Sequence, residues 1–163
     1  MKKSILILMC CLLLTAAESF ALDVNDPYLR TSVGVGLPYG GTIGLNNEIV
    51  LNEYFSVQLG VGYTSHINMG VVGGVSAYPI KNNQYPFSPR LTALYGKVGK
   101  VHYYSDDSYK RGDGYALGGG VEFPIAASKK WRAGLDLFYA KITDPVKSND
   151  DVVMSLGVGY SFK

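Results

Sequence analysis

The two histidines of the chain, His66 and His102, are the side chains best suited to act as general bases. A histidine can activate a serine that lies within hydrogen-bond distance, and one such arrangement places the serine two residues further along the chain. Asn68 stands two residues after His66, and Tyr104 stands two residues after His102. We therefore expect no catalytic residues, and we interpret both histidines as strand-end or loop residues.

The motif Arg111-Gly112-Asp113 matches a tripeptide that integrins bind, and it falls in a charged segment, 105–113, that we expect to form a surface loop. A given tripeptide often arises by chance, and glycine beside aspartate is typical of a turn. We therefore interpret the motif as part of a turn.

Clusters of acidic and amide residues in this segment and in the polar segment 142–151 could gather a divalent cation. Their spacing matches no defined calcium loop, so we interpret them as solvated loop residues and predict no metal and no cofactor. The residues concerned are Asp106, Asp107, Asp113, Asp144, Asn149, Asp150 and Asp151.

The first 21 residues have the three parts of a secretory signal peptide. Two lysines near the start are followed by a run of 13 residues, 5–17, that is apolar except for Thr15, and Ser19-Phe20-Ala21 places small residues at the cleavage positions. The apolar run is too short to cross a membrane as a helix. We predict cleavage after residue 21, which leaves residues 22–163 as a single domain.

The composition of the mature chain excludes two classes of protein. Both cysteines lie within residues 1–21, so the mature chain cannot be a disulfide scaffold. Removing Lys2, Lys3 and Glu18 from 15 basic and 13 acidic residues leaves 13 and 12, a balance that gives no support for nucleic-acid binding. The chain has 13 tyrosines and 20 glycines and, after residue 21, no helical periodicity. We therefore expect an all-β protein.

Alternation of apolar with small or polar residues is strictest between Tyr115 and Tyr139. Its two arms, 115–123 and 131–139, each carry an aromatic residue at both ends. Strict alternation predicts strands with two unlike faces, and roughly nine tilted residues cross the hydrocarbon layer of a membrane. We predict a transmembrane β-hairpin. Similar segments complete a set of eight strands, at 29–37, 42–51, 55–64, 69–78, 90–104, 115–123, 131–139 and 152–162.

The composition of the two faces of these strands indicates which face is in contact with lipid. One face is aliphatic, whereas the other carries mostly Gly, Ser, Ala and Asn with occasional charges. A soluble barrel would show Lys, Glu and Thr to water, but small residues suit the crowded lumen of an eight-stranded membrane barrel. The charges would then be lumenal and would have to pair, with Glu122 and Arg132 as one candidate pair. The predicted lumenal polar network consists of Arg30, Glu48, Glu122, Arg132 and Asp136.

Aromatic residues at strand ends predict two belts at the two membrane interfaces. With the N-terminus in the periplasm, Phe55, Phe123, Trp131 and Phe162 fall at the periplasmic level, and Tyr63, Tyr115 and Tyr139 fall at the opposite level. Tyr160 lies on the same face as Phe162 and is assigned to the belts as well.

The alternating strands and the terminal segment 154–162 (MSLGVGYSF) give the chain a resemblance to the OmpA/OmpX-like family of small Gram-negative outer-membrane β-barrels. Such proteins typically end in an aromatic residue that the barrel-assembly machinery reads; here Lys163 follows Phe162. The resemblance implies an eight-stranded antiparallel barrel in the outer membrane. It also implies contact with lipid and lipopolysaccharide, and with periplasmic chaperones and the assembly machinery during biogenesis.

From this pattern we expect a monomeric, non-enzymatic integral outer-membrane protein with a structural or surface-interaction role. Some small outer-membrane barrels modify lipid A. The deacylase type uses the His-x-Ser arrangement that this chain lacks, whereas palmitoyl transfer by scattered polar groups stays open as an alternative. Two further alternatives stay open: a narrow porin-like channel for small solutes, and a soluble periplasmic lipocalin-like barrel that binds an apolar ligand.

Overall fold

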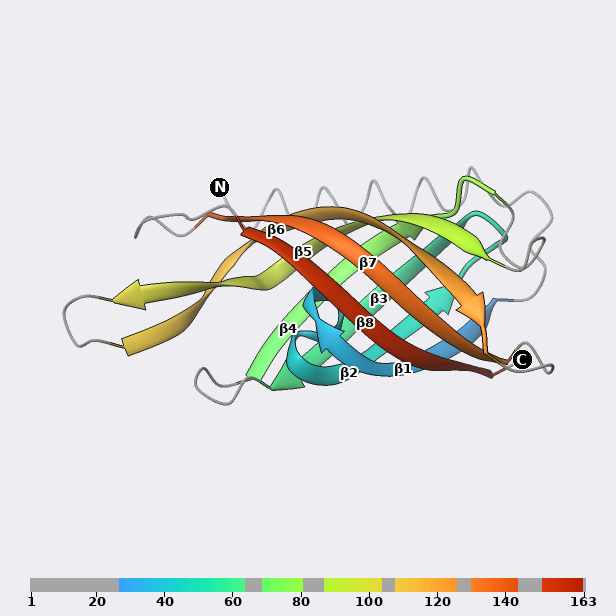
Figure 1. Cartoon of the computed structure of the whole chain (residues 1–163), viewed down its shortest axis with the longest axis horizontal. Helices are drawn as coiled ribbons and strands as arrows, with labels where there is room; N and C mark the ends of the chain where they lie inside the picture. The colour runs from blue at the N-terminus through green and yellow to red at the C-terminus, as the bar shows by residue number, and fades with distance from the viewer. Residues whose placement is uncertain are drawn as a thin grey trace.

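Eight antiparallel strands form a closed barrel in which every strand pairs with its sequence neighbours and the last strand pairs with the first (Figure 1). The computed structural model describes residues 27–63, 69–80, 87–103, 108–125, 130–143 and 151–162. Its strands are β1 (Tyr28–Gly36), β2 (Gly41–Val50), β3 (Phe55–Tyr63), β4 (Met69–Ala77), β5 (Ser88–Tyr103), β6 (Ser108–Pro124), β7 (Trp131–Ile142) and β8 (Asp151–Phe162). The predicted eight-stranded antiparallel meander is therefore confirmed. The predicted signal peptide lies outside the described residues.

The two ends of the barrel differ. β1 begins and β8 ends at the same end, where Leu29 pairs with Phe162; we call this the terminal end. At the other end, β5 and β6 continue to pair with each other beyond their pairing with β4 and β7, as far as Tyr103 and Ser108. This two-stranded ribbon projects from the barrel in Figure 1, and we call that end the hairpin end.

The ribbon corrects one prediction from the sequence. Residues 105–113 were expected to form a loop, but β6 begins at Ser108, and Arg111 pairs with Lys100 of β5. The motif Arg111-Gly112-Asp113 thus lies in a strand and not in a turn. The sequence of this ribbon lacks the strict alternation that marks the other strands, which is why the strand was not predicted. Residues 104–107 and 144–150, with most of the acidic residues considered as cation ligands, lie outside the described part, as does His66.

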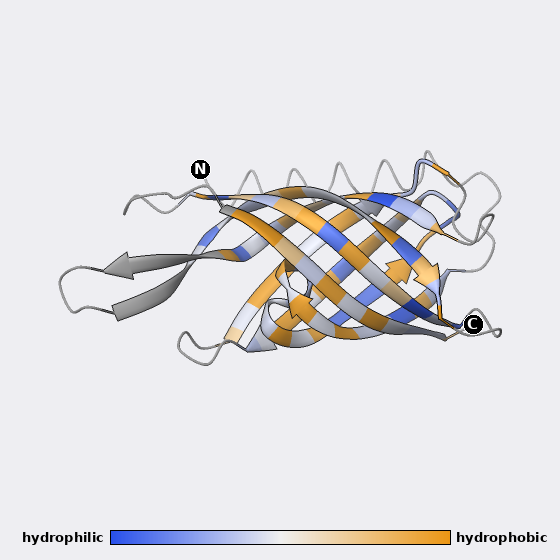
Figure 2. Ribbon diagram, in the orientation of Figure 1, coloured by the Kyte–Doolittle hydropathy of each residue, from blue (hydrophilic) through white to orange (hydrophobic). Residues whose placement is uncertain are grey.

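The outer surface of the barrel carries exposed apolar side chains from every strand. Figure 2 shows hydrophobic residues alternating with less hydrophobic ones along the strands. Alternate residues of β3 illustrate the rule, because Leu59 is 52% exposed whereas its neighbour Gly60 is buried. Exposed aliphatic side chains come from all eight strands and include Val33, Leu45, Leu59, Val71, Leu91, Leu117, Leu137 and Leu156. None of the helices in the described part of the chain is long and apolar enough to span a membrane.

The interior consists of two layers. Toward the hairpin end lies an apolar layer of Leu37, Val72, Leu94, Val98, Ala116, Phe138 and Ala140. Toward the terminal end lies a charged layer of Arg30, Glu48, Arg90, Glu122, Arg132 and Asp136, all buried. Phe138 and Asp136 are successive inward residues of β7, so the two layers are in direct succession along the barrel.

Between β1 and β2 the chain turns into the lumen instead of away from it. Leu37–Tyr39 form a short 3-10 helix, η1, whose three residues are all buried. The sequence placed Leu37 at the end of a strand and on its lipid-facing side, and this is wrong. Gly36 adopts φ 103° and ends the strand, and Gly40 adopts φ 67°, so positive-φ glycines flank the inward turn.

Candidate functional site

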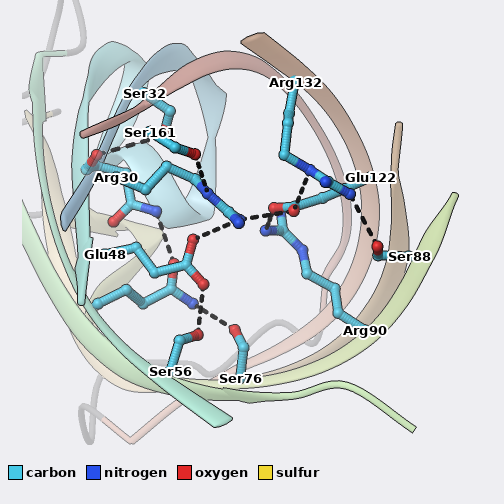
Figure 3. Close-up of polar contacts among 12 residues, drawn as sticks. Arg30, Ser32, Glu48, Ser56, Ser76, Ser88, Arg90, Glu122, Arg132 and Ser161 are labelled. Carbon is cyan, nitrogen blue, oxygen red and sulfur yellow. Dashed lines mark hydrogen bonds and ion pairs between the residues drawn. The ribbon is translucent and has the colours of Figure 1, made fainter. Parts of the chain in front are cut away.

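Glu122 is the centre of the charged layer. Its carboxylate lies 2.7 Å from Nη1 of Arg30 and 3.3 Å from Nε of Arg132, and it also accepts a hydrogen bond from Nη1 of Arg90. These four side chains come from β1, β5, β6 and β7, and Figure 3 shows them converging in the barrel interior. One carboxylate therefore ties together strands from opposite sides of the barrel.

Two further carboxylates complete the balance of charge. Oε2 of Glu48 lies 3.1 Å from Nη1 of Arg30. Asp136 accepts two hydrogen bonds from Arg90, one from Nε at 2.7 Å and one from Nη2 at 2.6 Å. This bidentate pairing fixes the plane of the guanidinium and is stronger than a single neutral hydrogen bond. Among the buried described residues, three arginines thus face three carboxylates, and no net charge is buried in this layer.

Neutral polar side chains form hydrogen bonds at the edges of the charged layer. Tyr78 donates a hydrogen bond of 2.8 Å to Oε1 of Glu48, and the hydroxyl of Ser56 donates to the same oxygen. Arg132 donates to the hydroxyl of Ser88 at 2.8 Å. A chain of amides and hydroxyls then links β2 to β5 through Asn46, Gln58, Ser76 and Thr92, with separations of 2.7, 3.2 and 2.8 Å.

All five residues of the network predicted from the sequence lie in this layer, each no more than 4% exposed. The predicted neighbours Glu122 and Arg132 form an ion pair. Sequence reasoning missed Arg90 and Tyr78. Arg90 alternates with the exposed Leu91, which is a usable signal, but Tyr78 directly follows β4, where the alternation of valines is irregular.

A small cavity lies among the side chains of the charged layer. This cavity of about 10 Å³ is lined by Arg30, Tyr39, Glu48, Arg90, Glu122 and Arg132 together with small residues. That volume is at the lower limit for holding one water molecule. The described residues contain no group of His, Cys, Asp and Glu that could hold a metal ion. The chemistry available here is ion pairing across the barrel, which joins its strands to one another.

The predicted aromatic belts consist of residues on the outer surface. Phe55, Tyr63, Tyr115, Phe123, Trp131, Tyr139 and Phe162 are exposed there. Tyr160 is half-buried because it lies between Trp131 and Phe162, with ring centroids 5.1 Å from each. Strand pairing places Trp131 beside Tyr160 and Phe162 beside Leu29 at the terminal end, whereas Tyr115 is paired with Tyr95 toward the hairpin end.

Among solved structures, the chain is similar to the crystal structure of the N-terminal β-barrel domain of Pseudomonas aeruginosa OprF. The TM-score is 0.57 and the sequence identity is 12%, and the match covers 84% of this chain and 100% of that chain. At this identity the likeness concerns the fold. No family model and no curated protein sequence matches the chain.

Proposed function

We propose that the protein is an integral membrane β-barrel of a Gram-negative outer membrane. The observation that carries the proposal is the reversal of the usual polarity, because aliphatic side chains cover the outside while six ionised side chains are buried inside. Water-soluble proteins rarely expose an apolar surface that extends around the molecule, whereas lipid requires one. A closed barrel also leaves no sheet edge unpaired within the hydrocarbon layer, as a bilayer demands. The similarity to the OprF barrel domain supports the same proposal at the level of the fold.

The aromatic side chains support a defined position in the bilayer. Trp131, Tyr160 and Phe162 would occupy the interface at the terminal end, and Tyr63, Tyr115 and Tyr139 would occupy the opposite one. In this orientation the terminal end faces the periplasm and the β5–β6 ribbon extends toward the lipopolysaccharide surface. The ribbon then supplies a surface for interaction outside the membrane. Biogenesis would require periplasmic chaperones and the barrel-assembly machinery, with Phe162 in its recognition signal.

The filled interior supports a structural or surface-interaction role rather than transport. Ion pairs cross the terminal half of the barrel, and apolar side chains together with η1 occupy the other half. A narrow channel would need a continuous path, and a lipocalin-like carrier would need an apolar cavity; the cavity among the charged side chains has a volume of about 10 Å³ and is lined by charged, polar and small residues. We propose that the barrel acts as a closed, non-enzymatic monomer.

Membrane fractionation combined with heat-modifiability tests this proposal. The mature protein should sediment with outer membranes, resist extraction by urea, and migrate faster on a denaturing gel before boiling than after it. Protein that stays in the aqueous fraction, or that sediments but shows a single mobility, would exclude a closed membrane barrel.

A further inference from the structure

The inward turn η1 packs closely against glycines on four strands of the barrel. Four glycines, one each on β1, β2, β3 and β8, surround Tyr39, and a Cβ on any of them would overlap an atom of that residue. They are Gly34, Gly44, Gly62 and Gly157. Gly60 leaves room in the same way for the carbonyl of Pro38. Because a side chain at any of these positions would overlap an atom of η1, the glycines leave the space that η1 occupies in the lumen.

The contacts of η1 bridge the seam where the barrel closes. η1 packs against β1, β2, β3 and β4, which precede or follow it closely in the chain, and against β8, which is the last strand. The backbone N–H of Leu37 donates to Oγ of Ser155 in β8 at 3.2 Å. The Tyr39 hydroxyl lies against Gly157, two residues further along β8.

This placement has a mechanical consequence. If β8 separates from β1, the contacts that Leu37 and Tyr39 make with β8 are broken together with the ladder between the two strands. If β2 separates from β3, the contacts of η1 with β8 need not break, so they do not oppose that separation. The two contacts with β8 therefore act at the β1–β8 seam.

We propose that η1 is an internal latch that holds the β1–β8 seam closed. The latch acts from inside the lumen, where it adds side-chain packing to the backbone pairing of β1 with β8 and to the hydrogen bond between Arg30 and Ser161 across the same seam. This role goes beyond the proposed location and holds for the barrel in detergent or in lipid.

Gly157→Ala tests the latch, with Gly134→Ala as its matched control. The two glycines are directly paired on β8 and β7 and both face the lumen. A Cβ at position 157 would overlap the Tyr39 hydroxyl, whereas at position 134 its nearest neighbour would be the tip of Arg90 at 3.3 Å. In denaturing detergent, the compact form of Gly157→Ala should convert to the unfolded form about tenfold faster on warming than the parent protein. Gly134→Ala should stay within about twofold of the parent.

Disulfides across two different strand pairs identify where the latch acts. Val33→Cys with Val158→Cys would join β1 to β8, and Leu45→Cys with Val61→Cys would join β2 to β3. Both pairs are directly opposed in register and lie on the outer face. The predicted mature chain has no cysteine that would interfere. The seam disulfide should abolish the difference between Gly157→Ala and the parent, while the β2–β3 disulfide should leave it.

Tyr39→Ala provides the second variant. It removes the side chain that Gly157 accommodates, so Gly157→Ala should have no further effect in that background. If Gly157→Ala yields no compact form, Tyr39→Ala replaces it in the disulfide comparison. Its compact form should then convert to the unfolded form faster than that of the parent, and only the seam disulfide should restore the parent rate. The proposal would be overturned if Gly157→Ala and Gly134→Ala unfolded at equal rates. It would also be overturned if the β2–β3 disulfide slowed the unfolding of Gly157→Ala as much as the seam disulfide does.

Discussion

The guanidinium of Arg30 in β1 lies 2.7 Å from the carboxylate of Glu122 in β6, although 92 residues separate them in the chain. The pair spans the barrel interior and can form only when strands from both halves of the sequence surround one lumen. Burial of an ion costs several kcal/mol, which pairing and further hydrogen bonds offset only when the geometry is complete. The charged layer therefore couples closure of the barrel to a single arrangement of its strands.

Glu122→Gln should strongly destabilise the barrel. The substitution keeps the shape of the side chain but leaves three buried arginines facing two carboxylates. Breaking a buried ion pair from one side costs about 3–5 kcal/mol. Asp113→Asn, which disrupts an exposed ion pair with Lys97, should cost about 1 kcal/mol or less. Urea unfolding in detergent measures both, and equal losses would show that the charged layer does not contribute as described.

Leu59→Arg should destabilise the protein in lipid vesicles by about 2–4 kcal/mol, because an arginine would face the middle of the hydrocarbon layer. Leu59 lies halfway between Phe55 and Tyr63 on β3, and its side chain is 52% exposed on the outer surface. Tyr63→Arg on the same strand, at the level of an aromatic belt, should cost about 1 kcal/mol or less. Equilibrium unfolding in vesicles provides the comparison. If Leu59→Arg and Tyr63→Arg were equally stable, the middle of β3 would not be in contact with the hydrocarbon layer.

Purified protein in planar bilayers should give no discrete conductance steps. Ion pairs cross the terminal half of the lumen, and the cavity among them has a volume of about 10 Å³, close to the least space that holds one water molecule. A porin reconstituted in the same way serves as the positive control. Reproducible steps that depend on protein concentration would favour the alternative of a narrow channel.

Overproduction of the protein should leave the acyl pattern of lipid A unchanged. No histidine of the chain has a serine two residues after it, so base activation of a serine in that arrangement has no candidate. Mass spectrometry of lipid A from cells with and without the protein makes the comparison. An altered pattern would overturn the proposal that the barrel is not an enzyme.

Much of the fold could be predicted from the sequence because a membrane barrel imposes the same two-residue alternation on every strand. In β3, each residue from Phe55 to Tyr63 has the side predicted for it, and the inward positions of Arg30 and Glu48 follow from the same rule. Alternation gives the side of a strand on which a residue lies, but not its partner on another strand. The contact between Arg30 and Glu122 depends on closure and register and could not be read from local pattern.

Three features escaped prediction for separate physical reasons. The β5–β6 ribbon has no strict alternation in its sequence, so periodicity could not identify it as paired strands. Arg90 is the first residue of the predicted strand 90–104, so only the residues that follow it indicate its side. The inward turn of η1 depends on glycines of β3 and β8 that are distant in sequence, including Gly62 and Gly157. A connection between adjacent strands normally runs outside the sheet, and nothing local in Leu37–Tyr39 reverses that expectation.

Trp131 provides the most direct measurement of the central claim, that the aliphatic face of the barrel meets lipid. It is the one tryptophan of the chain, and it lies 47% exposed in the aromatic belt at the terminal end of β7. In vesicles that contain lipids brominated at different depths, its fluorescence should be quenched most by shallow bromines. In the Trp131→Phe background, Leu135→Trp on the same face of β7 should be quenched most by deep bromines. Absence of quenching at both positions, or the same depth for both, would contradict the account.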